Sequence, residues 1–505
     1  MTAIIHNPFR FFLLVGALLG GLVVAGPNAA WATDDALQNK VQQFTLDNGL
    51  TLLVAERHDS PTFTAYMTIG VGSVDEVADN RGVAHLLEHM RFKGTRRIGT
   101  RDFTAEQPLL DQIGQTARIL DQLRHDPHAD PAQQARLQEQ LKTLQHQQRA
   151  LVVKDEFSQI YARNGGVGFN AFTGKDLTSY LISLPANKLE LWMSLEADRM
   201  QNTVLREFYT ERDVVQEERR RSYESRPSGM MYEALLSTAF RVHPYRHPVI
   251  GWSSDIENLT REQTADFLHR YYAPVNTVIA IVGDVDTQQT LDYVQQYFGS
   301  IPAGDKIPPV TAVEPQQRGE RRCNVRFDAE PQLLVAFHKP TLPSRDDYAF
   351  DLISQMLTEG PTSQLYRSLV LDQQLATHVS SYSAPGARYD NLFILSLTPR
   401  SPHTTAELEQ ALYQELEQLK QQPIAPQELT RIAKRLRAER LRYLRTNDGL
   451  ANMLTRFQVV AGDWRYLVDY DQQIATLTGE DLQQAAKRWF NEENRTVITL
   501  VQEKP

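Results

Sequence analysis

Two stretches of this chain begin alike, with Leu259-Thr260-Arg261-Glu262 and with Leu477-Thr478-Gly479-Glu480. Each predicts a helix that a threonine caps and that carries a glutamate in its first turn. An arginine and two aromatic residues end each helix, and an apolar, β-branched strand follows at 276–282 and at 494–501. A helix followed by a strand can recur by chance in an α/β protein. The matched elements in matched order favour an internal duplication.

Proline, glycine and polar residues are concentrated between the two repeats, from Ile301 to Arg318. Such a composition is typical of a linker. We therefore expect a first domain over residues 33–302, a linker over 303–320 and a homologous second domain over 321–505.

Local patterns in both halves mix strands and helices. Asp47-Asn48-Gly49 lies between two apolar runs and predicts a β-hairpin over residues 44–55. Hairpins and long helices in this order predict the α+β class, with two homologous α/β sandwich domains, each a largely antiparallel sheet covered by helices. Further strands are expected at Thr62–Ile69 and Thr178–Leu184, and helices at Leu189–Met200, Asp347–Leu357 and Thr405–Leu419.

Residues 105–162 have no counterpart in the second half. Apolar residues recur at helical spacing on both sides of a turn at 126–131, so the segment predicts a helical hairpin with a glutamine-rich, solvated side. It could be a lid, a partner surface or a passive insertion. His125, His128 and His146 within it are expected to be exposed and not to bind a metal.

The N-terminus resembles a secretion signal. Arg10 is the single charged residue among the first 33, Phe11–Ala25 is apolar, and Ala30-Trp31-Ala32 is a small-residue cleavage site. An uncleaved membrane anchor is the alternative, but the apolar run is short for a span. We expect a signal peptide over residues 1–32, a mature chain from Thr33 and export to the periplasm.

Composition narrows the possible functions. The 505-residue chain carries a net charge of −9, and removal of the signal peptide, which holds one arginine and no acidic residue, leaves −10. This mild acidity gives no support for nucleic-acid binding and disfavours anionic membrane surfaces. Cys323 is the only cysteine, so packed cores and not internal disulfides must stabilise the protein.

The strongest chemical signal is His85-Leu86-Leu87-Glu88-His89. Histidines four residues apart lie on one face of a helix, so both imidazoles can reach a single ion. Glu88 lies beside them, where it can accept a proton from water. The order His-x-x-Glu-His is that of the inverted zinc peptidases. A chance occurrence is the alternative among 13 histidines, but Gly82 and the apolar residues around the motif are typical of a helix.

A hydrolytic zinc site needs a third protein ligand. The stretch 211–221 predicts a helix on which Glu211 and Glu218 share a face two turns apart, while Glu217 points elsewhere. The alternative is a solvated helix with Glu–Arg pairs, such as Glu217 with Arg221. Spacing alone does not choose between Glu217 and Glu218.

Three blocks of sequence together resemble one family. Gly82–Thr95 is similar to the active-site helix of the pitrilysin–insulinase metallopeptidases, and 170–173 and 211–218 match the next two blocks in order. The resemblance covers roughly residues 40–300, and the duplication extends it to the C-terminus. It points to the bacterial periplasmic, half-length type with two homologous domains.

The resemblance implies a role for each residue. His85 and His89 would bind Zn²⁺, Glu88 would be the general base, and Glu218 would be the third zinc ligand. Glu211 would support a histidine as a second-shell carboxylate. One Zn²⁺ per chain is implied, because the second half has no His-x-x-Glu-His.

The resemblance also implies how a substrate binds. Asn170, Ala171 and Phe172 would lie on an edge strand, to which an extended peptide adds by main-chain hydrogen bonds. Backbone contacts do not recognise side chains, so a broad sequence preference is expected. The segment 105–162 lengthens the usual gap between His89 and Glu218, but it begins and ends between elements and should leave the metal site intact.

Family members complete the site with an Arg and a Tyr from a strand of the C-terminal half or of a partner subunit. The corresponding stretch here, Asp390–Pro399, contains neither, and Arg388-Tyr389 lies just before it in a turn-like setting. We therefore expect a second, homologous subunit to supply both residues. The alternatives are a homodimer in place of a heterodimer, or a different alignment of this stretch with the family.

The function expected is that of a periplasmic zinc endopeptidase acting on peptides or unfolded segments. The alternative is a non-catalytic assembly or chaperone-like subunit of the same fold. A nucleotide-binding enzyme is excluded, because Gly165-Gly166-Val167-Gly168 is not followed by a Lys-Ser/Thr helix start. His243-Pro244-Tyr245-Arg246-His247 predicts a structural loop and not a second metal site.

Overall fold

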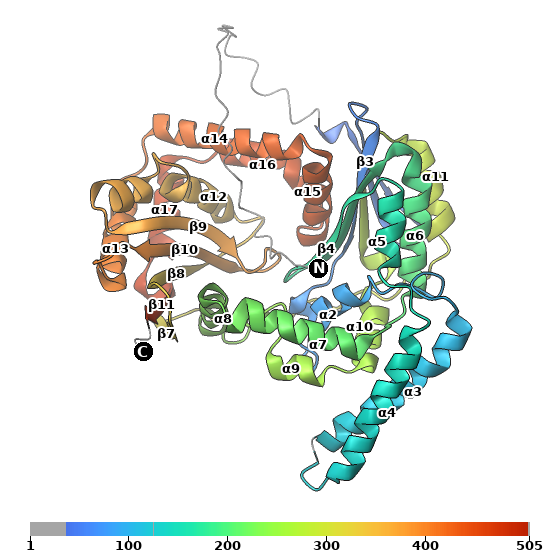
Figure 1. Ribbon diagram of the computed structural model, residues 1–505. Coiled ribbons are helices and arrows are strands. Elements are labelled where there is room, and N and C mark those ends of the chain that lie inside the picture. The colour runs from blue at the N-terminus through green and yellow to red at the C-terminus, as the bar shows by residue number, and fades with distance from the viewer. Residues whose placement is uncertain (1–36, 125, 503–505) are drawn as a thin grey trace.

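The computed structural model describes residues 37–124 and 126–502 (Figure 1). The predicted signal peptide and His125 therefore lie outside the described residues. The described chain contains two β-sheets, one from each half, with helices on both faces of each sheet.

The first half forms a six-stranded sheet in the order β1-β2-β6-β3-β5-β4. β2 and β6 are parallel and all other neighbours are antiparallel. Side chains alternate between two apolar cores, as Leu52 and Leu53 of β2 illustrate. The strands are β1 (Val41–Thr45), β2 (Thr51–Glu56), β3 (Thr62–Ile69), β4 (Val167–Thr173), β5 (Thr178–Pro185) and β6 (Thr277–Gly283).

The second half forms a five-stranded sheet in the order β7-β11-β8-β10-β9, in which only β7 and β11 are parallel. Taken in chain order, β2 to β6 and β7 to β11 occupy the same positions in the two sheets. This topology confirms the predicted class, two α/β sandwiches of common plan. The strands are β7 (Arg321–Phe327), β8 (Gln332–Lys339), β9 (Ala376–Ala384), β10 (Asn391–Pro399) and β11 (Arg495–Gln502).

Helices of the first half cover one face of the first sheet, where α2, α6, α10 and α11 share one apolar core with its strands. The helices are α2 (Val83–Met90), α3 (Phe103–Arg124), α4 (Pro131–Arg149), α5 (Glu156–Arg163), α6 (Leu189–Asn202), α7 (Phe208–Arg219), α8 (Pro227–Ala239), α9 (Ser253–Asn258), α10 (Arg261–Tyr271) and α11 (Thr287–Phe298).

Helices of the second half cover the second sheet in the same way, with α12, α13 and α17 in its core. The helices are α12 (Arg345–Thr358), α13 (Thr405–Gln421), α14 (Pro426–Leu444), α15 (Asn447–Val460), α16 (Tyr466–Ala475) and α17 (Gly479–Trp489).

Each half also contributes a helix to the other half's sheet. Leu450 and Leu454 of α15 pack on the outer face of the first sheet, beside Val278. Leu235 of α8 packs on the outer face of the second sheet, beside Ile394. Figure 1 shows α15 beside β3 and α8 below β8. Burial of apolar surface therefore holds the two halves together.

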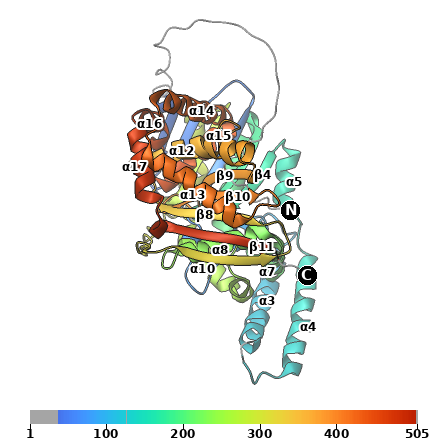
Figure 2. The ribbon, with the colours of Figure 1, turned by 90° about the vertical axis from the view of Figure 1, so that its left-hand side faces the viewer.

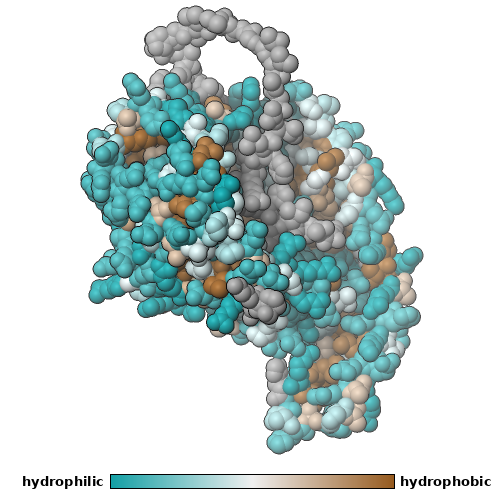
Figure 3. Space-filling view, turned by 60° about the vertical axis from the view of Figure 1, so that its left-hand side comes forward, coloured by the Kyte–Doolittle hydropathy of each residue, from teal (hydrophilic) through white to brown (hydrophobic). Residues whose placement is uncertain are grey.

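The helical hairpin predicted over 105–162 consists of α3 and α4, and α5 follows it after a short connection. The hairpin extends away from both sheets in the two ribbon views (Figures 1 and 2). His128 and His146 are exposed, as expected. Hydrophilic residues predominate on the face shown in Figure 3, and hydrophobic residues there form scattered small groups.

The local predictions agree with the structure. The hairpin at 44–55 consists of β1 and β2, and the predicted strands and helices differ from the observed ones by no more than two residues at the ends quoted. Thr260 and Thr478 cap α10 and α17, and Glu262 and Glu480 lie in the first turns, as predicted; Gln263 and Asp481 complete the capping boxes. A capping box uses the third helical residue, which lies one position beyond each glutamate.

Residues 302–318 have no regular secondary structure. Glu314 within this segment accepts backbone N–H groups of Arg241, Val242 and His243, so the segment is tied to the first half. In the described part of the chain, none of the helices combines the length and hydrophobicity that crossing a membrane requires.

Candidate metal centre

The helix α2 is buried along almost its whole length, which explains its mostly apolar sequence. It begins after Gly82, whose φ of +90° is a backbone conformation that favours glycine. Space requires glycine as well, because a Cβ here would lie 2.5 Å from the carbonyl oxygen of Ile250. Glu76 accepts hydrogen bonds from the backbone N–H groups of Gly82 and Ala84, both at 2.9 Å. Burial raises the pKa of Glu76 to about 8, so its contribution is to accept two N–H groups that have no partner within the helix.

The helix α7 carries both Glu217 and Glu218, between which the sequence spacing did not decide. Glu211, Val215 and Glu218 lie at helical spacing on one face, and the first two are buried. Glu217 points away and pairs with Arg220 and Arg221, as the alternative interpretation had expected for this residue. A π-helical turn, Arg220–Glu224, follows α7 directly.

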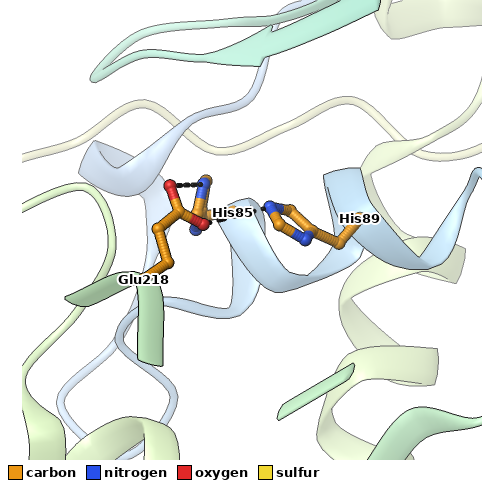
Figure 4. A group of neighbouring side chains, drawn as sticks. All are labelled: His85, His89 and Glu218. Carbon is orange, nitrogen blue, oxygen red and sulfur yellow. Dashed lines mark ion pairs between the residues drawn. The ribbon is translucent and has the colours of Figure 1, made fainter. Parts of the chain in front are cut away.

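The side chains of His85, His89 and Glu218 converge although α2 and α7 are far apart in the sequence (Figure 4). His85 Nε2 lies 3.7 Å from Glu218 Oε1, and His89 Nε2 lies 3.4 Å from Glu218 Oε2. Over residues 37–124 and 126–502, these three form the single group of His, Cys, Asp or Glu close enough to share an ion, with ligand atoms within 4.8 Å of one another. His243 and His247 belong to no such group.

This donor set fits Zn²⁺. Zinc takes imidazole nitrogens and carboxylate oxygens at about 2.1 Å in a tetrahedron, so its ligand atoms stand roughly 3.4 Å apart. The two distances to Glu218 are close to that spacing, and three protein donors leave one position for water or substrate.

The two histidines differ in protonation. Burial lowers the pKa of His85 to about 4, and the neighbouring His89 acts in the same direction. Burial also opposes the charge on His89, but its hydrogen bonds to Glu211 and Glu218 outweigh burial and raise the pKa to about 10. A cation at this place would compete with the proton on His89.

Glu211 orients the ring of His89. His89 Nδ1 donates to Glu211 Oε1 at 3.0 Å, which leaves Nε2 directed at Glu218. Lys93 Nζ lies 2.5 Å from the other oxygen of Glu211. Burial would raise the pKa of Glu211, but the hydrogen bonds with His89 and Lys93 lower it to about 2. The carboxylate therefore stays ionised as a fixed acceptor.

Glu88 lies beside the convergence and is only 8 % exposed. Its Oε2 accepts a hydrogen bond from Thr173 Oγ1 at 2.6 Å. Burial raises the pKa of Glu88, and the charge of His89 and the hydroxyl of Thr173 reduce this effect. A carboxylate with a raised pKa is a better proton acceptor near neutrality.

The strand β4 is the outer strand of its sheet and also contacts α2. Asn170 and Phe172 are exposed and Ala171 is buried, in the alternation that a strand dictates. Within the described residues β4 pairs only with β5, so its other edge can accept a further strand.

Arg388 and Tyr389 lie in the turn between β9 and β10, as their sequence setting indicated. The guanidinium of Arg388 donates to the carbonyl oxygens of Asp176, at 2.8 Å, and of Gly70, at 3.4 Å. Tyr389 packs on His243 and Tyr245. Both side chains are engaged within the chain.

Sequence reasoning did not identify Lys93, Thr173 or Glu76. Lys93 follows His89 by four residues, a spacing that predicts proximity to it. Thr173 is the last residue of the matched block 170–173, and Glu76 is an acidic residue shortly before a helix start, where anions are favourable. Only the contacts themselves separate these three from other polar neighbours.

Two sequence profiles of known families together match more than half of the chain. The profile described as Insulinase (Peptidase family M16) matches residues 52–114 and 147–252. The profile described as Peptidase M16 inactive domain matches residues 258–436. Residues 115–146, which the first profile leaves unmatched, make up most of the hairpin of α3 and α4.

Individual relatives agree with these matches. A protein named zinc protease PqqE, from Helicobacter pylori, is 28% identical over 469 residues, which are 91% of this chain and 93% of the relative. A solved protease structure from Helicobacter pylori has a TM-score of 0.77 at 28% identity and covers 92% of this chain and 100% of that one. A structure described as a peptidase M16 inactive domain, from Pseudomonas fluorescens, has a TM-score of 0.72 at 18% identity, covers 92% of this chain and 99% of that one, and shows the shared fold alone. The chain therefore belongs to the insulinase family of peptidases, family M16.

Proposed function

We propose that this chain is a zinc-dependent endopeptidase that hydrolyses peptides or unfolded protein segments. The convergence of His85, His89 and Glu218 beside Glu88 carries the proposal. A relative of nearly equal length that is named a zinc protease supports it.

The residues would divide the chemistry as follows. Zn²⁺ held by His85, His89 and Glu218 would supply Lewis acidity, which polarises a carbonyl group and lowers the pKa of water. Glu88 would take a proton from the attacking water and deliver it to the leaving amine. Glu211 would hold His89 in the tautomer whose Nε2 lone pair is free.

The substrate would bind as an additional strand along the free edge of β4, beside Asn170, Ala171 and Phe172. This edge ends at Thr173, which contacts Glu88, so a peptide paired with β4 would run past the proposed base. Main-chain pairing suits extended or unfolded segments.

A second, homologous chain would supply the Arg and Tyr that stabilise the oxyanion. Strand β10 has neither residue, and Arg388 is occupied by two carbonyl groups of its own chain. The partner would form a heterodimer, with a homodimer as the alternative. Hydrolysis by the purified chain alone, at the rate reached with a co-expressed homologue, would exclude the heterodimer.

The apolar run and the predicted cleavage site near the N-terminus support a periplasmic location.

The second candidate is a non-catalytic assembly or chaperone-like subunit. The match of the second half to a profile described as an inactive domain favours it. The four side chains at the proposed centre argue against it, since a subunit without catalysis has no need of them.

Metal analysis and one substitution separate the two. The chain from Thr33 onwards is expected to contain about one zinc ion and to hydrolyse a fluorogenic peptide or unfolded casein, alone or with its homologue. Glu88→Gln should keep the zinc and lower kcat about 10²- to 10⁴-fold, because it removes only the proton acceptor. Full zinc with undiminished hydrolysis in Glu88→Gln would exclude Glu88 as the base, and absence of hydrolysis in the wild type would favour the subunit.

A further inference from the structure

The turn between β9 and β10 docks on the first half. We refer to its residues 384–389 as the docking turn. Ala387 N and Arg388 N donate to Asp176 Oδ2 at 2.6 and 3.1 Å, and the Arg388 side chain donates to the Asp176 carbonyl. Two successive backbone N–H groups form a favourable cradle for a carboxylate. Asp176 is only 4 % exposed, so it depends on these donors.

The contact is tight and anchored on both sides. Tyr245, which is fully buried, donates through its hydroxyl to Asp176 Oδ1 at 2.6 Å. A Cβ on Gly386 would lie 2.2 Å from that hydroxyl oxygen, so no larger residue fits without displacement. On the side of the second half, Asn391 and Thr341 hold the carbonyl groups of Gly386 and Ala387, each at 2.6 Å.

Asp176 lies in the turn that joins β4 to β5. The turn is closed by Gly174 N donating to Leu177 O at 2.8 Å. Thr173, the last residue of β4, directly precedes it and donates to Glu88 at 2.6 Å. Thr178 opens β5 opposite Thr173 and donates to Val71 O at 3.0 Å. The docking turn therefore holds Asp176, and the backbone of this tight turn connects Asp176 to Thr173, which contacts Glu88.

We infer that the second half of the chain has a task at the active centre: its docking turn positions Glu88, through Asp176 and Thr173. This inference rests on the proposed function, because positioning Glu88 matters only if Glu88 is the base. Thr173 and Asp176 are positioning residues in this scheme. A carboxylate fixed by a hydroxyl cannot rotate away from the water that it must deprotonate.

The direct test replaces Thr173. Thr173→Val keeps the shape of the side chain and removes the hydroxyl, so kcat should fall about 10- to 100-fold while KM stays within about twofold and zinc content is unchanged. Thr173→Ser restores the hydroxyl and should recover most of kcat. A wild-type kcat in Thr173→Val, or an equal loss in both variants, would overturn the inference.

The link to the second half is tested at Asp176. Asp176→Asn should lower kcat, and the double variant with Thr173→Val should be no slower than Thr173→Val alone, because both act through one series of contacts. Independent, multiplicative losses would overturn the link. Tyr66→Phe is a matched control, since Tyr66 also donates to an aspartate, Asp448 at 2.8 Å, but joins the halves away from the centre. It should leave kcat unchanged, and a loss equal to that of Asp176→Asn would count against a specific role.

Amide hydrogen exchange gives a measurement that does not require activity. Asp176→Asn should accelerate exchange at Ala387 and Arg388 and in residues 173–178, whereas Tyr66→Phe should not. Unchanged protection of 173–178 in Asp176→Asn would overturn the inference whether or not the chain hydrolyses peptides. Increased exchange in a chain that shows no hydrolysis would support the mechanical link and count against the proposed function.

Discussion

The helices α2 and α12 occupy comparable places in the two halves but carry different ionisable residues, histidines on α2 and aspartates on α12. Each follows the strand, β3 or β8, that lies inside its sheet. On α2, His85 and His89 face a carboxylate from another helix. On α12, Asp347 pairs with the buried Lys339, and Asp351 accepts a hydrogen bond from Tyr470 at 2.5 Å.

The difference lies in where the balancing charge comes from. The second half carries its own cation, Lys339, which is 2 % exposed and fixed next to its carboxylate. The first half brings together two imidazoles and a carboxylate, a donor set suited to an external cation. The same scaffold therefore supports either a closed internal ion pair or a candidate metal centre, according to a few side chains.

Removing Glu218, the proposed metal ligand on α7, should have the largest effect. Glu218→Gln is expected to abolish zinc binding near neutral pH and to lower hydrolysis about a thousandfold or more, because two imidazoles alone hold the ion weakly. Glu217→Gln is the control, since the ion pairs of Glu217 among the described residues are those with the exposed Arg220 and Arg221, and it should change both quantities less than about twofold. Metal analysis and a peptide assay measure the outcome; equal losses in both variants would remove Glu218 as a ligand.

A smaller effect is expected at Glu211. Glu211→Gln weakens the acceptor that orients His89, so zinc affinity should fall about 10- to 100-fold in competition with a chelator. Glu207→Gln is the matched control, because Glu207 also lies near Lys93, at 3.9 Å, but touches neither histidine. If Glu207→Gln weakened zinc binding as much, the effect would belong to Lys93 and not to His89.

In the second half, replacing the carboxylate of Asp351 by an amide should stabilise the protein. Burial and the charge of Asp347 raise the pKa of Asp351. A raised pKa in the folded state means that stability is lost as the pH rises from the unfolded pKa through the folded one. Asp351→Asn should therefore raise Tm by a few degrees at pH 8 and by almost nothing at pH 4. A Tm gain that is equal at both pH values would exclude this ionisation as its cause.

Shortening the helical hairpin of α3 and α4 should have the smallest effect on hydrolysis and on Tm. Replacing residues 122–138 by a short Gly-Asn turn keeps Ile113, Ala117 and Leu144, which join the first core. The segment removed contributes an exposed ion pair from Arg124 to Glu257, worth at most about 1 kcal/mol. Peptide hydrolysis should stay within about twofold and Tm within about 3 °C. A large loss with folded protein and full zinc would make the hairpin part of the substrate site.

The prediction of the fold succeeded where signals were local or repeated. Asp47-Asn48-Gly49 specifies its hairpin through turn geometry, and the threonine caps at 260 and 478 mark two helices that the duplication places alike. The exchange of α8 and α15 between the sheets was not predicted. Apolar helix faces in the sequence do not state which sheet they cover.

The candidate centre shows the same division. Sequence alone determined that His85, Glu88 and His89 share one helix turn, because helical spacing is a local property. Spacing left Glu217 and Glu218 open and the family resemblance implied Glu218, but only the tertiary structure brings Glu218 to the two histidines. Only the tertiary structure, too, shows that Thr173 contacts Glu88. Those contacts depend on how α7 and β4 pack against α2, and packing arises from the whole core rather than from any single stretch of chain.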